Sequence, residues 1–103
     1  MSSPEPLHLR FARSGGMLPQ VLTLELDEAQ LSDEEAAAVR TIEEQGGFER
    51  FAGLPSSGPG ADMYQYDLEA RRGERSTALR FDEFRLPAEL APLVQLLERR
   101  ASR

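Results

Sequence analysis

Two stretches near the start of the chain alternate apolar and polar residues with a period of two. In Leu7–Phe11 two leucines and a phenylalanine share one face, and in Val21–Leu26 three leucines do the same. This alternation is typical of β-strands that place one face on a core and the other in water. The glycine pair Gly15-Gly16 lies between the two stretches and favours a hairpin, because glycine adopts positive φ at no steric cost.

A helix is predicted after this first pair of strands. Ser32 and Glu35 form a capping-box pattern, which satisfies free backbone donors in the first turn of a helix. Residues 36–45 contain neither proline nor glycine, and Gly46-Gly47 can end the helix. A short further turn against the core is expected from three apolar residues at spacings of three: Phe48, Phe51 and Leu54.

The second half of the chain repeats the pattern. Met63–Ala70 and Ser76–Phe81 alternate again, and we expect Arg71–Glu74 to be the turn of a second hairpin. The apolar residues that follow have the spacing of one helix face: Leu90, Leu93, Val94 and Leu97. Because proline disrupts a helix interior, this helix either begins at Pro87 and kinks at Pro92, or follows a turn at Pro87 and begins near Pro92.

These elements predict an α+β fold with the order ββαββα. Its simplest form is a four-stranded, mostly antiparallel sheet with both helices packed on one face. We expect residues 1–6 to be a flexible N-terminal lead-in and residues 7–103 to be a single domain, since the chain has 103 residues. The order of the strands within the sheet cannot be read from the pattern.

Charge and composition narrow the possible functions. The net charge of −6 argues against nucleic acid and anionic membranes as partners, because both require clustered Lys and Arg. With no cysteine and with His8 as the single histidine, the chain lacks the usual ligands of a zinc site. His8 is also the only possible imidazole base, and no serine stands in a nucleophile-elbow motif. We therefore expect no metal, no cofactor and no enzymatic activity.

The candidate site is the connection between the first two strands. Apolar Met17 and Leu18 follow the glycine pair, and Pro19 restricts the backbone after them. Such a tip is either folded into the core or exposed to a partner, and residue chemistry leaves both alternatives open. The candidate binding residues are Arg13, Ser14, Gly15, Gly16, Met17, Leu18 and Pro19.

Several short motifs resemble the emfourin family, small bacterial inhibitors of thermolysin-like zinc metalloproteases of the protealysin type. The resemblance covers nearly the whole chain after residue 6. The motifs are Arg13-Ser14-Gly15-Gly16 followed by an apolar residue, Leu24-Glu25-Leu26-Asp27, Phe48–Pro55, Asp62–Tyr66, and Leu86-Pro87 with Leu93, Val94 and Leu97. A tryptophan that often stands in the last helix of that family is missing, and Gln95 and Leu96 occupy this region.

The resemblance implies an intracellular, non-catalytic inhibitor whose partner is a thermolysin-like metalloprotease, and we therefore expect the protein in the cytoplasm. Proteases of that type prefer a bulky apolar group on the primed side of the cleavage site. Met17 or Leu18 would suit this preference, and the loop Ser14–Pro19 would block the active-site cleft. The alternative is a protein–protein interaction module or subunit without inhibitory activity, which would use a sheet face or an edge strand.

Overall fold

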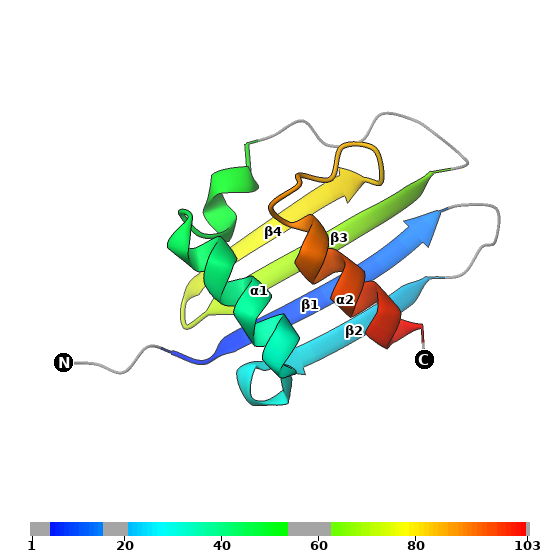
Figure 1. Cartoon of the computed structure of the whole chain (residues 1–103). Coiled ribbons are helices and arrows are strands. Elements are labelled where there is room, and N and C mark those ends of the chain that lie inside the picture. The colour runs from blue at the N-terminus through cyan, green and yellow to red at the C-terminus, as the bar shows by residue number, and fades with distance from the viewer. Residues whose placement is uncertain (1–4, 16–20, 54–62, 103) are drawn as a thin grey trace.

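The alternating stretches form strands and the capped stretches form helices, in the predicted order. The computed structural model describes residues 5–15, 21–53 and 63–102. The elements in this part of the chain are β1 (Leu7–Gly15), β2 (Leu22–Asp27), the 3₁₀ turn η1 (Glu28–Gln30), α1 (Asp33–Glu44), the 3₁₀ turn η2 (Phe48–Phe51), β3 (Tyr64–Arg72), β4 (Arg75–Asp82) and α2 (Ala91–Ala101). Figure 1 shows both α-helices across the same face of the sheet, which confirms the predicted α+β fold.

The described residues form a four-stranded sheet with the order β2-β1-β3-β4, and each neighbouring pair is antiparallel. The first and second hairpins therefore meet at β1 and β3. These two central strands carry most of the apolar residues on the sheet's inner face, whereas Leu26 is the one fully buried residue of β2 among those described. The strands that can bury the most surface lie in the middle.

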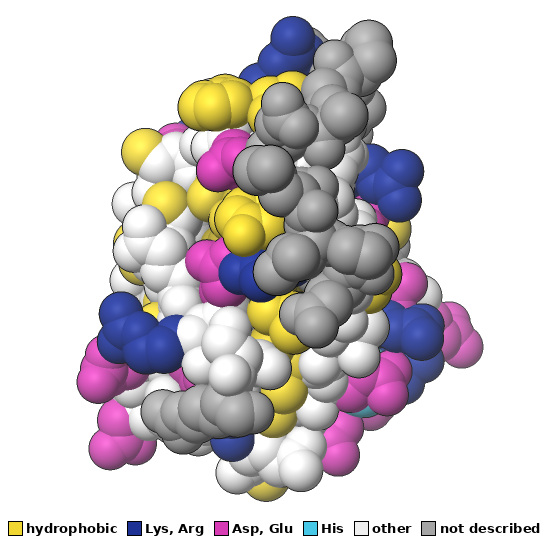
Figure 2. Space-filling model, turned by 90° about the vertical axis from the view of Figure 1, so that its right-hand side faces the viewer, with side chains coloured by type: hydrophobic (Ala, Val, Ile, Leu, Met, Phe, Trp, Pro, Cys, Tyr) yellow, Lys and Arg dark blue, Asp and Glu magenta, His cyan; other side chains and the backbone are white. Residues whose placement is uncertain are grey.

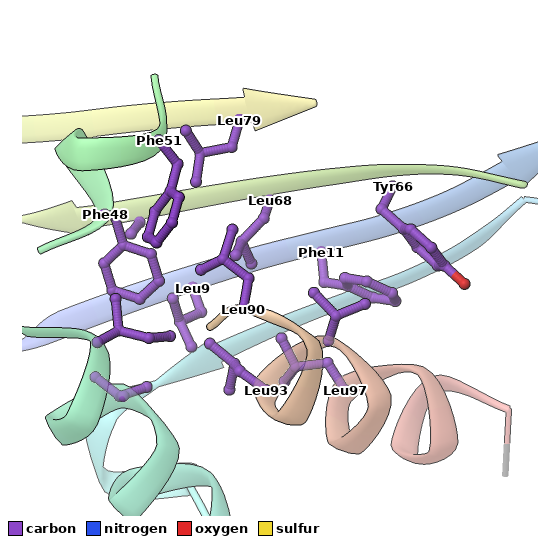
Figure 3. Packing of buried hydrophobic residues seen from close by; sticks show 14 of the residues in the cluster. Leu9, Phe11, Phe48, Phe51, Tyr66, Leu68, Leu79, Leu90, Leu93 and Leu97 are labelled. Atoms are coloured by element: carbon purple, nitrogen blue, oxygen red, sulfur yellow. The ribbon is translucent and has the colours of Figure 1, made fainter. Parts of the chain in front are cut away.

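The core lies between the sheet and the two helices. Phe11 and Leu9 project from β1 toward α2, and Leu93 and Leu97 point back from the helix (Figure 3). The Phe11 and Tyr66 rings lie 6.1 Å apart between centroids. The buried apolar residues of the described chain are Leu7, Leu9, Phe11, Leu26, Val39, Ile42, Phe48, Phe51, Tyr66, Leu68, Ala70, Leu79, Phe81, Leu90, Leu93, Val94 and Leu97.

The predicted start and end of α1 are confirmed, and the structure shows which of the two predicted starts of α2 is correct. Ser32 and Glu35 form the expected reciprocal capping box, and α1 ends just before Gly46-Gly47. Helix α2 begins at Ala91, so Pro92 stands in its first turn, where a missing N–H is harmless. The backbone at Pro87 forms a separate turn, in which the Pro87 carbonyl accepts hydrogen bonds from the N–H groups of Leu90 and Ala91.

Two predicted boundaries are wrong. Arg71 and Arg72 belong to β3 rather than to the turn, which consists of Gly73 and Glu74. Strand β1 does not end at Phe11 but continues to Gly15. In both cases the neighbouring strand supplies backbone partners that extend the ladder beyond the alternating apolar run.

Candidate functional site

The first three candidate residues lie at the end of β1. Arg13 pairs with Leu22 of β2, and Ser14 and Gly15 pair with Gln65 and Tyr64 of β3. The remaining candidates, which are Gly16, Met17, Leu18 and Pro19, lie outside the described residues. The structure therefore places the base of the candidate loop on a paired strand. We call this end of the sheet, with Gly15, Val21, Tyr64 and Phe84, the loop end.

Gly15 has a backbone geometry that other residues would not tolerate. Its φ is +88°, in the region that L side chains rarely adopt. A Cβ built on it would lie 2.4 Å from the carbonyl oxygen of Met63, which belongs to the backbone and cannot swing away. The glycine thus allows β1 and β3 to approach closely just where the candidate loop leaves the sheet.

Arg13 is held by a cluster of side chains on the inner face of the sheet. Its Nη1 donates to Oε2 of Glu98 on α2 at 2.6 Å, and both side chains are largely buried, with 21% and 25% exposed. Its guanidinium lies over the Tyr64 ring, 4.3 Å from the ring centroid. The Tyr66 hydroxyl donates to the same Glu98 oxygen at 3.3 Å. We call Arg13, Tyr64, Tyr66 and Glu98 the Arg13 brace.

The electrostatics of the Arg13 brace favour a neutral tyrosine. Burial and the neighbouring Glu98 carboxylate raise the pKa of Tyr66 from 10.0 to about 12. The Arg13 Nε is buried without a hydrogen-bond partner among the described residues. A charged side chain in this position is stabilised by the ion pair and by the aromatic ring below it. The Arg13 brace therefore ties α2 to the last residues of β1, where the candidate loop begins.

Exposed apolar side chains also gather at the loop end. Val21, immediately before β2, is 61% exposed, and Phe84, two residues after the end of β4, is 78% exposed. In the part of the chain that the structure describes, these are the large hydrophobic side chains left open to solvent. Figure 2 faces this side of the molecule, and hydrophobic side chains reach its surface between acidic and basic ones.

Sequence reasoning named Arg13 as a candidate but missed its partner Glu98 and the exposed Phe84. Arg13 has the same parity as Leu9 and Phe11, so the alternation itself placed a cation on the inner face, where it needs a carboxylate. That the carboxylate belongs to Glu98 could not be read, because it comes from the far end of the chain. Phe84 stands alone between charged residues, and this exception to the pattern was the available signal.

The face of the sheet that the helices leave open carries a second feature. A shallow hollow of about 560 Å³ lies over the middle of β1, β3 and the two outer strands. Small side chains form its floor at Ala12, Thr23 and Ala78, and Arg10, Glu25, Asp67 and Glu69 stand around it. The charges around the hollow are mixed, since Arg10 pairs with Glu25 and Asp67 pairs with Arg80.

The described residues contain no group of three or more His, Asp and Glu side chains arranged to hold a metal ion. In the same part of the chain, no helix has both the length and the apolar character needed to cross a membrane. His8, the single histidine, lies on the outer sheet face with its Nδ1 2.9 Å from Oδ1 of Asp27.

These features define a small α+β scaffold whose distinctive site is the braced end of a hairpin strand. The family model of emfourin matches residues 11–98, and the chain therefore belongs to the emfourin family. This confirms the resemblance found in the sequence, and membership of this inhibitor family implies a role as a protease inhibitor. No curated protein and no solved structure matches the chain.

Proposed function

We propose that this protein inhibits a thermolysin-like zinc metalloprotease by placing the loop Ser14–Pro19 in the active-site cleft. The observation that carries the proposal is the Arg13 brace together with the pairing of β1 as far as Gly15. A loop that leaves a rigid strand loses less conformational entropy on binding than a free segment does. The protease-inhibitor role of the emfourin family supplies the class of partner.

The inserted group in this proposal is Leu18, with Met17 beside it. Both are large and apolar, which matches the preference of thermolysin-like proteases on the primed side of the cleavage site. Pro19 fixes φ and removes a backbone donor, and this would hinder cleavage of the bound loop. The assignment of these three residues rests on the sequence and on the family's class of target.

The direct test is to measure the inhibition constant of the wild-type protein against a thermolysin-like protease. Truncating a buried interface anchor commonly costs about 2–4 kcal/mol, so we expect Leu18→Ala to raise the inhibition constant roughly 30- to 1000-fold. Leu18→Glu should raise it further, because an unpaired charge would enter an apolar pocket. Neither change should lower the melting temperature if Leu18 is exposed.

Leu96→Ala is the matched control. Leu96 is half-buried on α2 beside Ser32 and Arg99 and does not belong to the Arg13 brace, so its truncation should leave inhibition unchanged. A Leu18→Ala variant with full inhibition and a lowered melting temperature would place Leu18 in the core and refute the anchor assignment. The same measurement on Met17→Ala shows which of the two side chains is the main anchor.

The second candidate function is a non-inhibitory interaction module that uses the open sheet face. The hollow over Ala12, Thr23 and Ala78 favours this alternative, because small residues let a partner approach the sheet. Ala78 is exposed, so Ala78→Arg would fill the hollow without disturbing the core. Absence of inhibition by the wild-type protein, together with binding of a partner that Ala78→Arg abolishes, would favour this module over inhibition through the loop.

A further inference from the structure

Phe84 is the most exposed large hydrophobic residue that the structure describes, with 78% of its surface accessible. It does not lie on a loose segment. The buried carboxylate of Asp82, 2% exposed, accepts hydrogen bonds from the backbone N–H of Phe84 at 2.8 Å and of Arg85 at 2.9 Å. A buried carboxylate is costly unless its hydrogen bonds are satisfied, so these bonds fix the turn that carries Phe84.

The same turn is joined to β3 by two further hydrogen bonds. The Glu83 N–H donates to the Tyr64 carbonyl at 3.0 Å, and the Tyr64 N–H donates to the Glu83 carboxylate at 3.1 Å. Tyr64 in turn pairs with Gly15 across the β1–β3 ladder. The Phe84 turn is therefore an extension of the sheet and shares its rigidity.

This register also locates Phe84 relative to the candidate loop. Gly15, Tyr64 and Glu83 stand side by side on three neighbouring strands. Neighbouring strands lie ~4.8 Å apart, so the Phe84 turn begins roughly 10 Å from the base of the loop. A protease that receives the loop in its cleft would therefore come within reach of Phe84 as well.

We propose that Phe84 is a second anchor of the inhibitor, which contacts an apolar surface of the protease beside the active-site cleft. The inference rests on the function proposed above. An aromatic side chain on a braced turn supplies a large contact area at little ordering cost, which is the usual character of interface hot spots. A second contact outside the cleft adds affinity that does not depend on the residue in the primed-side pocket.

The test compares the wild-type protein, Phe84→Ala, Phe84→Leu and the control Leu96→Ala in inhibition and thermal melting. We expect Phe84→Ala to raise the inhibition constant about 10- to 100-fold with an unchanged melting temperature, because the side chain makes its contacts in the complex. Phe84→Leu should recover part of the loss, and Leu96→Ala should match the wild type in its inhibition constant. In the double variant Leu18→Ala/Phe84→Ala the two effects should multiply, since the anchors occupy separate surfaces.

Four outcomes would overturn the inference. If the wild-type protein inhibits the protease and Phe84→Ala has the same inhibition constant, Phe84 does not belong to the interface, while the proposed function still holds. If the wild-type protein does not inhibit the protease, both the proposed function and the role of Phe84 as an anchor are refuted. A lowered melting temperature in Phe84→Ala would show a structural role. A change of elution volume in gel filtration, without a change in inhibition, would assign Phe84 to self-association instead.

Discussion

The two ends of the sheet differ in the side chains that they present at the surface. At the end opposite the loop end, which we call the turn end, β3 and β4 are joined by Gly73 and Glu74, and Arg72 closes the structure. Its guanidinium donates to the Glu5 carbonyl at 2.6 Å, to Glu43 at 3.0 Å and to Glu28 at 3.1 Å. The turn end is thus sealed by a short turn and by several ion pairs near the surface.

At the loop end, the described residues include a short ion pair between Arg13 and Glu98, and it lies on the inner face. The large apolar side chains Val21 and Phe84 of this end remain exposed. The comparison shows that one end of the sheet closes the fold, whereas the other holds its backbone rigid and leaves apolar groups uncovered. Exposed apolar groups on a rigid frame are characteristic of a recognition surface.

The largest difference in stability between the two ends is expected from alanine substitutions at Gly15 and Gly73. Gly15→Ala combines a φ of +88° with a Cβ only 2.4 Å from a backbone oxygen, so we expect it to destabilise the fold by about 2–4 kcal/mol. Gly73→Ala also has positive φ, but its nearest neighbour is the flexible Glu5 side chain, so about 1 kcal/mol is expected. Urea unfolding of both variants measures the difference. Equal destabilisation would mean that the loop end is no more constrained than the turn end.

The two arginines give the next largest effect. Arg13→Met leaves the Glu98 carboxylate largely buried without its cation, which should cost about 1–3 kcal/mol and vary little with salt. Arg72→Met should cost at most about 1 kcal/mol and less at high salt, because its partners Glu28 and Glu43 are 51% and 39% exposed.

Inhibition separates the roles of the two arginines further. We expect Arg13→Met to raise the inhibition constant while the variant is still folded, because Arg13 positions the base of the loop, and we expect Arg72→Met to leave it unchanged. The pair should be assayed well below both melting temperatures. Weaker inhibition in Arg72→Met alone would reverse the assignment of the binding surface to the loop end.

The smallest expected effect is a pH dependence in the Arg13 brace. The pKa of Tyr66 is raised from 10.0 to about 12 in the folded protein, so the unfolded chain releases this proton first. The free energy of unfolding should therefore fall as the pH rises from 10.0 toward about 12. Tyr66→Phe, which lacks the ionisable hydroxyl, should show a shallower fall in urea titrations over this range. Identical slopes for both proteins would show that Tyr66 contributes nothing to the alkaline instability.

Most of the fold could be predicted because its signals are local. Period-two alternation marked all four described strands, and Ser32 with Glu35 marked the start of α1. The same local reasoning left Pro87 and Pro92 undecided, since either could stand in a first helical turn. The structure places Pro92 there.

The candidate site was less accessible to this reasoning. The sequence drew attention to the connection after Arg13, and the alternation put Arg13 on the inner face. Its partner Glu98 and the neighbouring Tyr66 are separated from it by most of the chain, so no spacing rule joins them. Phe84 is placed near the loop only through the pairing of two strands that are distant in sequence.

The sequence by itself determined the elements, the capping of the first helix and the membership of the emfourin family, because each is encoded in short stretches of neighbouring residues. Only the tertiary structure decided that β1 and β3 lie side by side in the centre of the sheet. That pairing depends on which strands can bury the most apolar surface together, a property of the whole chain. From it follow the extension of β1 to Gly15, the Arg13 brace and the position of Phe84 at the loop end.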